Sequence, residues 1–237
     1  MSDVDIGQLA SQIDAELAGL GTPERARQEK AYLKSDLIHY GVGVPAVRRV
    51  AKSVVALDHP DLISLVSALW DSPVYERRQV TVELLTVGRA QLVPTDMDLL
   101  ERFLRESRTW ALVDHLAEHV VGELVVLIEQ LGSVLDRWAR DSVFWIRRSA
   151  FLALLGPLRS GGGDFDRFSR YADSMLEEKE FFIRKAIGWV LRDTAKRRPD
   201  LVYEWILPRA ARASGVTIRE VVKPLSEQQR ERVLAAR

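Results

Sequence analysis

The chain contains no cysteine, which excludes a disulfide framework and a thiolate metal site and suits a reducing compartment. It also lacks any apolar run near the roughly 18 residues that predict a membrane-spanning helix. Its first residues are acidic and lack the basic-then-apolar order of a signal peptide. Together these absences predict a cytoplasmic globular protein. Arginine greatly outnumbers lysine, a bias that a GC-rich bacterial genome would produce and that also suits phosphate binding.

Net charge is missing as well, because 34 Lys and Arg residues balance 34 Asp and Glu residues. Taken whole, this balance argues against non-specific binding to nucleic acid. The charge is nevertheless segregated along the chain. Residues 1–20 carry four acids and no base, whereas residues 179–198 carry seven bases and two acids. A local basic patch is therefore predicted near residues 179–198.

Alternating strand patterns are scarce, and apolar residues recur at helical spacing, as in Leu62, Val66 and Leu69. The β-branched stretch 120–128 could form a strand, but Gly122 and the flanking periodicity favour a helix. Prolines fall between the periodic blocks, at positions where helices would begin, as at Pro23 and Pro73. Residues 160–163, SGGG, predict a loop inserted between repeats. The expected fold class is all-α.

A four-fold repeat runs through the chain. The segments YERRQV, WALVDH, WIRRSA and FIRKAI align on leading aromatics that are 35, 35 and 37 residues apart: Tyr75, Trp110, Trp145 and Phe182. This period resembles that of HEAT-like α-solenoids, which stack antiparallel helix pairs. We expect a single domain over residues 1–237, with an acidic N-terminal helix at 1–20 and core repeats at about 60–205.

The repeat also sorts helix faces. Counted from the leading aromatic as zero, positions 0, 3, 4 and 7 share a face that mixes aromatic, basic and small residues. Positions 5 and 9 are mostly apolar and should be buried. Stacked side by side, the first faces predict a concave surface lined with Arg, Lys and aromatic rings, which suits a polyanion. Trp145 could instead be core.

The second repeat departs from this pattern. It has Leu112 and Val113 where its sisters have bases, and it then places a lone acid, Asp114. One interpretation is structural: Asp114 could accept hydrogen bonds from a neighbouring repeat or pair with Arg148.

A metal site is a second interpretation, because His115, Glu118 and His119 match the H-x-x-E-H pattern of a zinc peptidase class. The two histidines, however, occupy positions 5 and 9, which are apolar in the other copies. Hydrogen-bonded core histidines explain them more simply, so no metal and no cofactor are expected.

The third interpretation is catalytic. Trp110 and Asp114 lie one helical turn apart and should project together. An ionised carboxylate beside a sugar stabilises positive charge that develops at the anomeric carbon. At about 4 Å and an effective dielectric near 20 this is worth roughly 4 kcal/mol, or about three decades of rate.

At these residues the sequence resembles the AlkD-type alkylpurine DNA glycosylases, bacterial repair enzymes with HEAT-like repeats. The longest match is KEFFIRKAIGWVLR at 179–192, and WALVD at 110–114 matches the catalytic Trp and Asp of the family. WIRR at 145–148 matches its arginine-bearing repeat, and residues 69–71 and 30–41 match more loosely. The resemblance runs from about residue 20 to about residue 225.

The resemblance implies a monofunctional, monomeric glycosylase acting on double-stranded DNA in the bacterial cytoplasm, at the nucleoid. It would hydrolyse the N-glycosidic bond of cationic N3- or N7-alkylated purines, including bulky adducts, and leave an abasic site. The family does this without flipping the base into a pocket. Because the base is already cationic and leaves neutral, no general acid is required, unlike in ordinary glycosidases.

The resemblance also implies residue roles. Asp114 would stabilise the oxocarbenium-like state and position water, while Trp110 and Trp189 would contact the deoxyribose. The DNA backbone would be held by five residues: Arg148, Lys185, Arg192, Tyr32 and Arg78. Two alternatives remain open: a HEAT-repeat DNA-binding protein without activity, and a protein-binding solenoid scaffold.

Overall fold

The structure is a computed structural model and describes residues 4–54 and 57–237. In these ranges the chain is all-α, as predicted, and its β pairing is limited to an isolated bridge between Ile38 and Val74. The chain forms two compact units that divide between Leu116 and Ala117. No helix in the described ranges has the length and apolar character needed to cross a membrane. The single-domain expectation stays a prediction.

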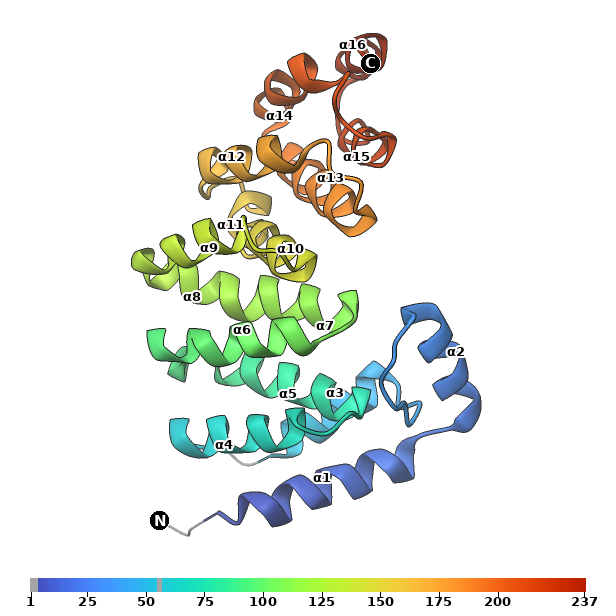
Figure 1. Ribbon diagram of the computed structural model, residues 1–237, viewed down its shortest axis with the longest axis vertical. Helices are drawn as coiled ribbons and strands as arrows, with labels where there is room; N and C mark the ends of the chain where they lie inside the picture. Colours follow the sequence, from blue (N-terminus) through green and yellow to red (C-terminus); the bar gives the residue numbers. More distant parts are fainter. Residues whose placement is uncertain (1–3, 55–56) are drawn as a thin grey trace. The chain divides into compact units, whose positions relative to one another are not determined.

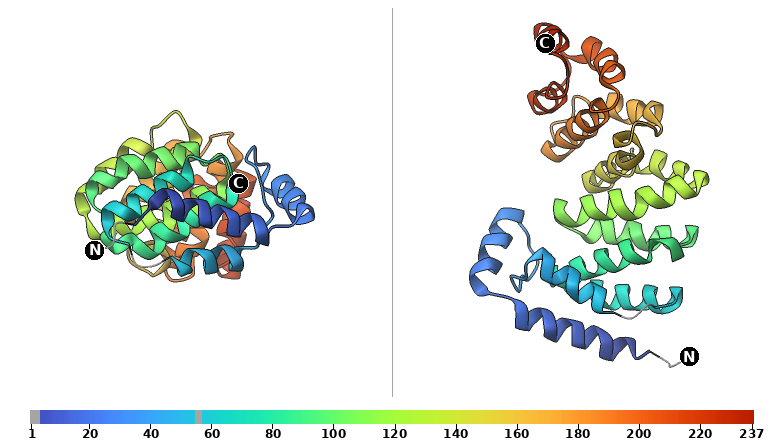
Figure 2. Two further views of the ribbon diagram at one scale, coloured as in Figure 1. Left: turned by 90° about the horizontal axis from the view of Figure 1, so that it is seen from below. Right: turned by 180° about the vertical axis from the view of Figure 1, so that it is seen from behind.

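The first unit contains seven α-helices among its described residues (Figure 1): α1 Ile6–Leu20, α2 Pro23–Leu33, α3 Val44–Ser53, α4 His59–Trp70, α5 Tyr75–Gly88, α6 Met97–Glu106 and α7 Trp110–His115. The predicted N-terminal helix is therefore present from Ile6, while its residues 1–3 lie outside the described part. Helices α3 and α5 pack together, as do α5 and α7. Helix α2 and the loop after it stand out from the other helices of this unit (Figure 2).

The second unit begins within a π-helical segment, Leu116–Val121, that directly follows α7. Its helices are α8 Gly122–Leu127, α9 Gly132–Trp138, α10 Phe144–Leu152, α11 Leu155–Arg159, α12 Phe165–Met175, α13 Phe181–Ala195, α14 Pro199–Ile206, α15 Gly215–Val221 and α16 Glu227–Ala235. Residues 120–127 are helical, as expected, and Ile128 lies just beyond the end of α8. Helix α13 packs against both α10 and α15.

Local sequence signals set many of the helix starts. Thr22 caps α2 by accepting a hydrogen bond from the backbone N–H of Arg25, and Pro23 occupies the first turn. Pro73 behaves differently from the prediction. It precedes α5 by two residues, and its carbonyl accepts the N–H of Ile38 in the β-bridge.

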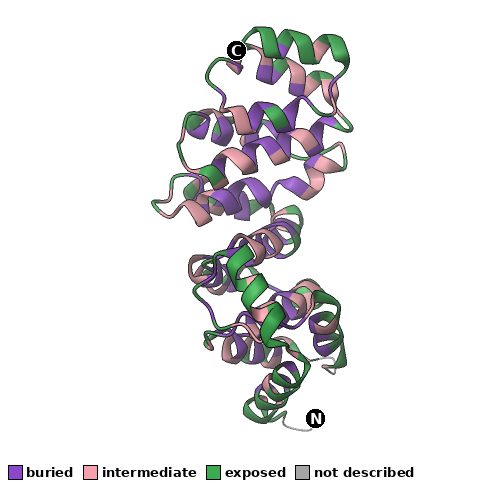
Figure 3. Ribbon diagram, turned by 90° about the vertical axis from the view of Figure 1, so that its right-hand side faces the viewer, coloured by how far each residue is buried: buried purple, intermediate pink, exposed green. Residues whose placement is uncertain are grey.

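The repeat is visible in the structure. The four leading aromatics stand at the first or second position of α5, α7, α10 and α13. Polar contacts between successive repeats recur at nearly the same sequence separation: Trp70 to Glu106, Trp205 to Ser169 and Arg209 to Asp173 each span 36 residues. Buried residues gather on the helix faces that pack within each unit (Figure 3). Positions 5 and 9 are buried in the first, third and fourth copies, as predicted.

Candidate functional site

Trp110 and Asp114 lie one turn apart on α7, and both are half-buried. Trp110 meets the ring of Tyr32 edge-on, with ring centroids 5.8 Å apart. Tyr32 lies in the last turn of α2 and is 73% exposed. Three of the site residues predicted from the sequence therefore lie near one another in the first unit: Tyr32, Trp110 and Asp114.

A cavity of about 350 Å³ lies beside Trp110 in the first unit. Aromatic, apolar and charged side chains from α2, α3, α5 and α7 line it, among them Tyr32, Tyr75, Trp110, Glu29 and Glu83. Glu83 pairs with Arg48 at 2.9 Å. The predicted site residue Trp110 thus forms part of the wall of a largely apolar cavity.

The loop after α2 is anchored by one buried carboxylate. Glu76 is fully buried and accepts the backbone N–H groups of Tyr40, Gly41 and Val42 at 3.0, 2.6 and 3.1 Å. Gly41 has φ +82°, and a Cβ there would lie 2.2 Å from the carbonyl oxygen of Thr22, so this turn requires glycine. By holding this loop, Glu76 helps to fix the position of α2, whose Tyr32 contacts Trp110.

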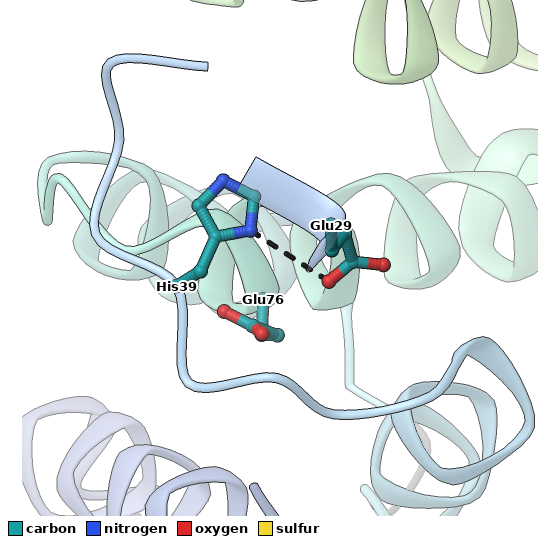
Figure 4. A group of neighbouring side chains, drawn as sticks. All are labelled: Glu29, His39 and Glu76. Atoms are coloured by element: carbon teal, nitrogen blue, oxygen red, sulfur yellow. Dashed lines mark ion pairs between the residues drawn. The ribbon is translucent and has the colours of Figure 1, made fainter. Parts of the chain in front are cut away.

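Figure 4 shows the neighbours of this anchor, Glu29 and His39. His39 stacks on Tyr75 at 4.6 Å, and its Nδ1 lies 3.6 Å from Glu29. Glu29, His39 and Glu76 could hold a cation by proximity alone. The carboxylate of Glu76, however, already serves three backbone donors, whose positive ends would face such an ion. The arrangement is better explained as a loop anchor.

The histidines of the second repeat do not follow the prediction equally. His115 is half-buried, and its Nε2 lies 3.3 Å from the hydroxyl of Thr86, in keeping with a hydrogen-bonded histidine. His119 is exposed, so its assignment to the core was wrong. The π-helical segment contains an extra residue per turn, which shifts position 9 off the buried face. The carboxylate of Glu118 pairs with Arg159.

Arg78 and Arg148 are 8% and 3% exposed. Arg78 donates to the carbonyls of Ser72 and Glu106 at 3.2 and 2.6 Å and lies over the Trp70 ring. Burial lowers the pKa of Arg78, and the opposing charge of Glu106 offsets this only in part. Arg148 donates to the carbonyl of Phe182, 34 residues away. Each arginine thus joins its own repeat to the next one by a hydrogen bond. This favours a structural role over the predicted phosphate contact.

The second unit gathers cations around Asp193, a nearly buried acid on α13. Its Oδ2 accepts the indole N–H of Trp189 and the Nε–H of Arg159, both at 3.0 Å. Its Oδ1 accepts from Arg192 at 3.2 Å and pairs with Lys196 at 2.7 Å. Trp189 and Arg192, both predicted site residues, are therefore held by the same carboxylate.

Glu220, on α15, likewise forms ion pairs with several cations. It pairs with Lys185 at 2.6 Å, with Lys223 at 2.9 Å and with Arg192. Burial alone would raise the pKa of Asp193 and of Glu220, but the hydrogen bonds from their cationic partners outweigh burial and lower both pKa values to about 2. The two acids thus stay charged and fix the cations in place.

We define the α13–α15 basic cluster as the five cations held by these acids: Arg159, Lys185, Arg192, Lys196 and Lys223. Lys185 keeps 40% and Lys196 keeps 56% of its side chain exposed. Sequence reasoning missed Arg159 and Lys223 as members of this cluster, and it missed Asp193 and Glu220 as the acids that hold it. The i, i+4 spacing of Trp189 and Asp193 was a usable signal, but Glu220 lies beyond any local pattern.

The predicted residues divide between the two units. Tyr32, Arg78, Trp110 and Asp114 belong to the first, and Arg148, Lys185, Trp189 and Arg192 belong to the second. The predicted pairing of Asp114 with Arg148 and the continuous concave face therefore stay predictions.

Solved structures similar to this chain share its helical-repeat fold. A predicted DNA alkylation repair enzyme from Enterococcus faecalis is 22% identical, with a TM-score of 0.79 over 87% of this chain and 97% of that one. AlkD2 from Streptococcus mutans is 16% identical, with a TM-score of 0.67 over 94% of this chain and 100% of its own.

A third similar structure is the alkylpurine DNA glycosylase AlkC from Pseudomonas fluorescens, bound to DNA containing an abasic site analogue. It is 17% identical, with a TM-score of 0.54 over 98% of this chain and 65% of that one. These likenesses confirm the α-solenoid fold class. No curated protein sequence matches the chain.

The family model described as DNA alkylation repair enzyme matches residues 13–225. That range contains both candidate catalytic residues, Trp110 and Asp114, and the whole α13–α15 basic cluster. The chain belongs to the DNA alkylation repair enzyme family.

Proposed function

We propose that the protein is a monofunctional DNA glycosylase that releases cationic N3- or N7-alkylated purines from double-stranded DNA and leaves an abasic site. The observation that carries this proposal is the placement of Trp110 and Asp114 on one turn of α7, where both are half-buried and Trp110 lines a cavity. Membership of the DNA alkylation repair enzyme family supports it, and so does the AlkC structure, which holds abasic-analogue DNA.

The chemistry needs few groups. An alkylated purine is a cation that departs as a neutral base, so its leaving group requires no protonation. Asp114 supplies negative charge near the anomeric carbon and orients the attacking water, while Trp110 contacts the sugar. At about 4 Å and an effective dielectric near 20, one carboxylate is worth roughly 4 kcal/mol. A reaction of this kind needs neither a base-binding pocket nor a metal.

The DNA backbone would be held chiefly by Lys185 and Arg192 of the α13–α15 basic cluster. Their heads are partly exposed and preorganised by Glu220, so a phosphate meets cations that are already in position. Arginine and lysine at such a site bind phosphate through charge-assisted hydrogen bonds. Tyr32, exposed beside Trp110, is a further candidate contact.

Release of free base tests the proposal. The protein is incubated with duplex DNA containing 7-methylguanine, with and without EDTA, and free base is measured. We expect release at the same rate in both. Asp114→Asn should slow release by roughly three decades while leaving DNA affinity nearly unchanged. Asp98→Asn, which removes an exposed carboxylate from the first turn of α6, is the matched control and should not slow release.

Each alternative gives a different outcome. DNA binding without any release would identify a non-catalytic DNA-binding relative. Absence of both binding and release would favour a protein-binding scaffold. A release rate that Asp114→Asn does not change would refute the role assigned to Asp114.

A further inference from the structure

The turn that joins α6 to α7 contains an arginine in an unfavourable backbone conformation. Arg108 has φ +54°, and the only other described non-glycine residue with positive φ is Lys34, which caps α2. Helices often end in a left-handed residue at this position, and it is usually glycine, because a Cβ makes the conformation costly. Here an arginine occupies the place immediately before Thr109 and Trp110.

The backbone of this turn is held without help from the Arg108 side chain. Ser107 is fully buried, and its hydroxyl donates to the carbonyl of Phe103 at 2.7 Å. Thr109 is 1% exposed. The buried guanidinium of Arg78 donates to the carbonyl of Glu106 at 2.6 Å. The strained conformation is therefore imposed by the neighbours, and the arginine side chain is left to solvent.

Among the residues that the structure describes, no acid compensates the charge of Arg108. Arg108 is exposed, and none of the described residues forms a hydrogen bond or an ion pair with its side chain. The arginines of α6 differ, since Arg102 pairs with Asp71 at 3.0 Å and Arg105 pairs with Glu101 at 2.6 Å. The positive charge of Arg108 contributes to lowering the pKa of the nearby buried Arg78. Thus a cation without a partner in the described part of the chain lies two residues before Trp110 and six before Asp114.

We infer that Arg108 is a phosphate-binding residue of the first unit, positioned to hold the DNA backbone beside the catalytic pair. The inference rests on the proposed function, which makes DNA the partner. A guanidinium fork matches two phosphate oxygens, and a rigid turn lowers the entropy that is lost when it binds. Because α7 starts directly after this turn, a phosphate held by Arg108 fixes the sugar–phosphate chain relative to Trp110 and Asp114.

The test is a salt titration of binding to a duplex that carries an abasic-site analogue, so that no chemistry is required. Arg108→Gly removes the cation and relieves the left-handed strain, so its Tm should equal or exceed that of the wild type. We expect roughly ten-fold weaker binding and a slope of log K against log salt that is smaller by about 0.9. Arg108→Lys should retain most of the slope.

Arg102→Ala is the matched control, because it removes the same charge from the neighbouring helix but from an arginine already paired with Asp71. Its salt slope should change little. An Arg108→Gly protein with an unchanged affinity and slope, beside a wild type that binds, would overturn the inference and leave the glycosylase proposal intact. A wild type that does not bind DNA would overturn both.

Discussion

At the scale of single residues, two acids organise the α13–α15 basic cluster. Asp193 and Glu220 are 5% and 8% exposed at their side chains, and each receives at least three hydrogen bonds or ion pairs. Without these two acids, the neighbouring cations would repel one another. The two carboxylates therefore hold the cations close together, and this electrostatic stabilisation is lost only when the carboxylates are protonated.

The lowered pKa of Asp193 makes the stability of the folded protein depend on pH in acid. The pKa of Asp193 in the folded protein, about 2, lies below its ordinary value of 3.8. Its stabilisation is thus fully present above about pH 4 and is lost as pH falls toward 2. Asp193→Asn should lower the free energy of unfolding by on the order of 2 kcal/mol at neutral pH.

Urea unfolding of the wild type and of Asp193→Asn across this pH range measures the effect. The difference between the two proteins should shrink as pH drops. Asp36→Asn, at an exposed position, serves as the control and should shift stability by no more than about 0.5 kcal/mol. A difference between wild type and Asp193→Asn that is constant with pH would contradict the assigned pKa.

At the scale of elements, the repeat pattern predicted which helix faces are buried, because positions 5 and 9 follow directly from helical periodicity. The prediction of buried positions failed where the α-helix gives way to a π-helix. The π-helical segment Leu116–Val121 moves His119 to the surface, and nothing in the apolar spacing announces it. The pattern also could not show that Arg78 and Arg148 are buried, because their partners lie 28 and 34 residues away.

Close helix packing makes a second prediction. Gly188 lies where α13 meets α15, and a Cβ there would stand 3.0 Å from the Cβ of Glu220 and 3.1 Å from the Cα of Thr217. Gly188→Ala should push α15 away, cost about 1–3 kcal/mol of stability and loosen the hold of Glu220 on Lys185.

Thermal unfolding measures that cost. Gly19→Ala is the matched control, because Gly19 lies in α1 with nothing within 4 Å of the added carbon. It should stabilise the protein by about 0.5–1 kcal/mol. Equal Tm changes in both variants would show that the α13–α15 contact does not require glycine.

At the scale of the whole molecule, the zero net charge conceals a division between the two units. Residues 1–116 contain 13 Lys and Arg against 17 Asp and Glu, a net of −4, and residues 117–237 contain 21 against 17, a net of +4. Binding of a polyanion must therefore depend on local cations, chiefly those of the second unit. Non-specific attraction by the whole chain contributes little.

DNA binding should accordingly be steeply salt-dependent in spite of neutrality. If about four phosphates are contacted, a four-fold rise in salt should weaken binding on the order of a hundred-fold. Fluorescence anisotropy with an undamaged duplex at several salt concentrations measures this slope. A flat response would place the binding energy in uncharged contacts and remove the basic cluster from the proposed interface.

The sequence by itself determined the all-α class, the repeat of about 35 residues, the DNA alkylation repair family and the pair Trp110 and Asp114 as candidates. These depend on spacing along one helix or on local motifs, which a linear sequence records. Only the tertiary structure decided that Arg78 and Arg148 donate to carbonyls of neighbouring repeats, that Glu220 holds cations of the basic cluster and that Arg108 has no hydrogen-bond or ion-pair partner among the described residues. Those outcomes depend on burial and on contacts between distant segments, which packing alone creates.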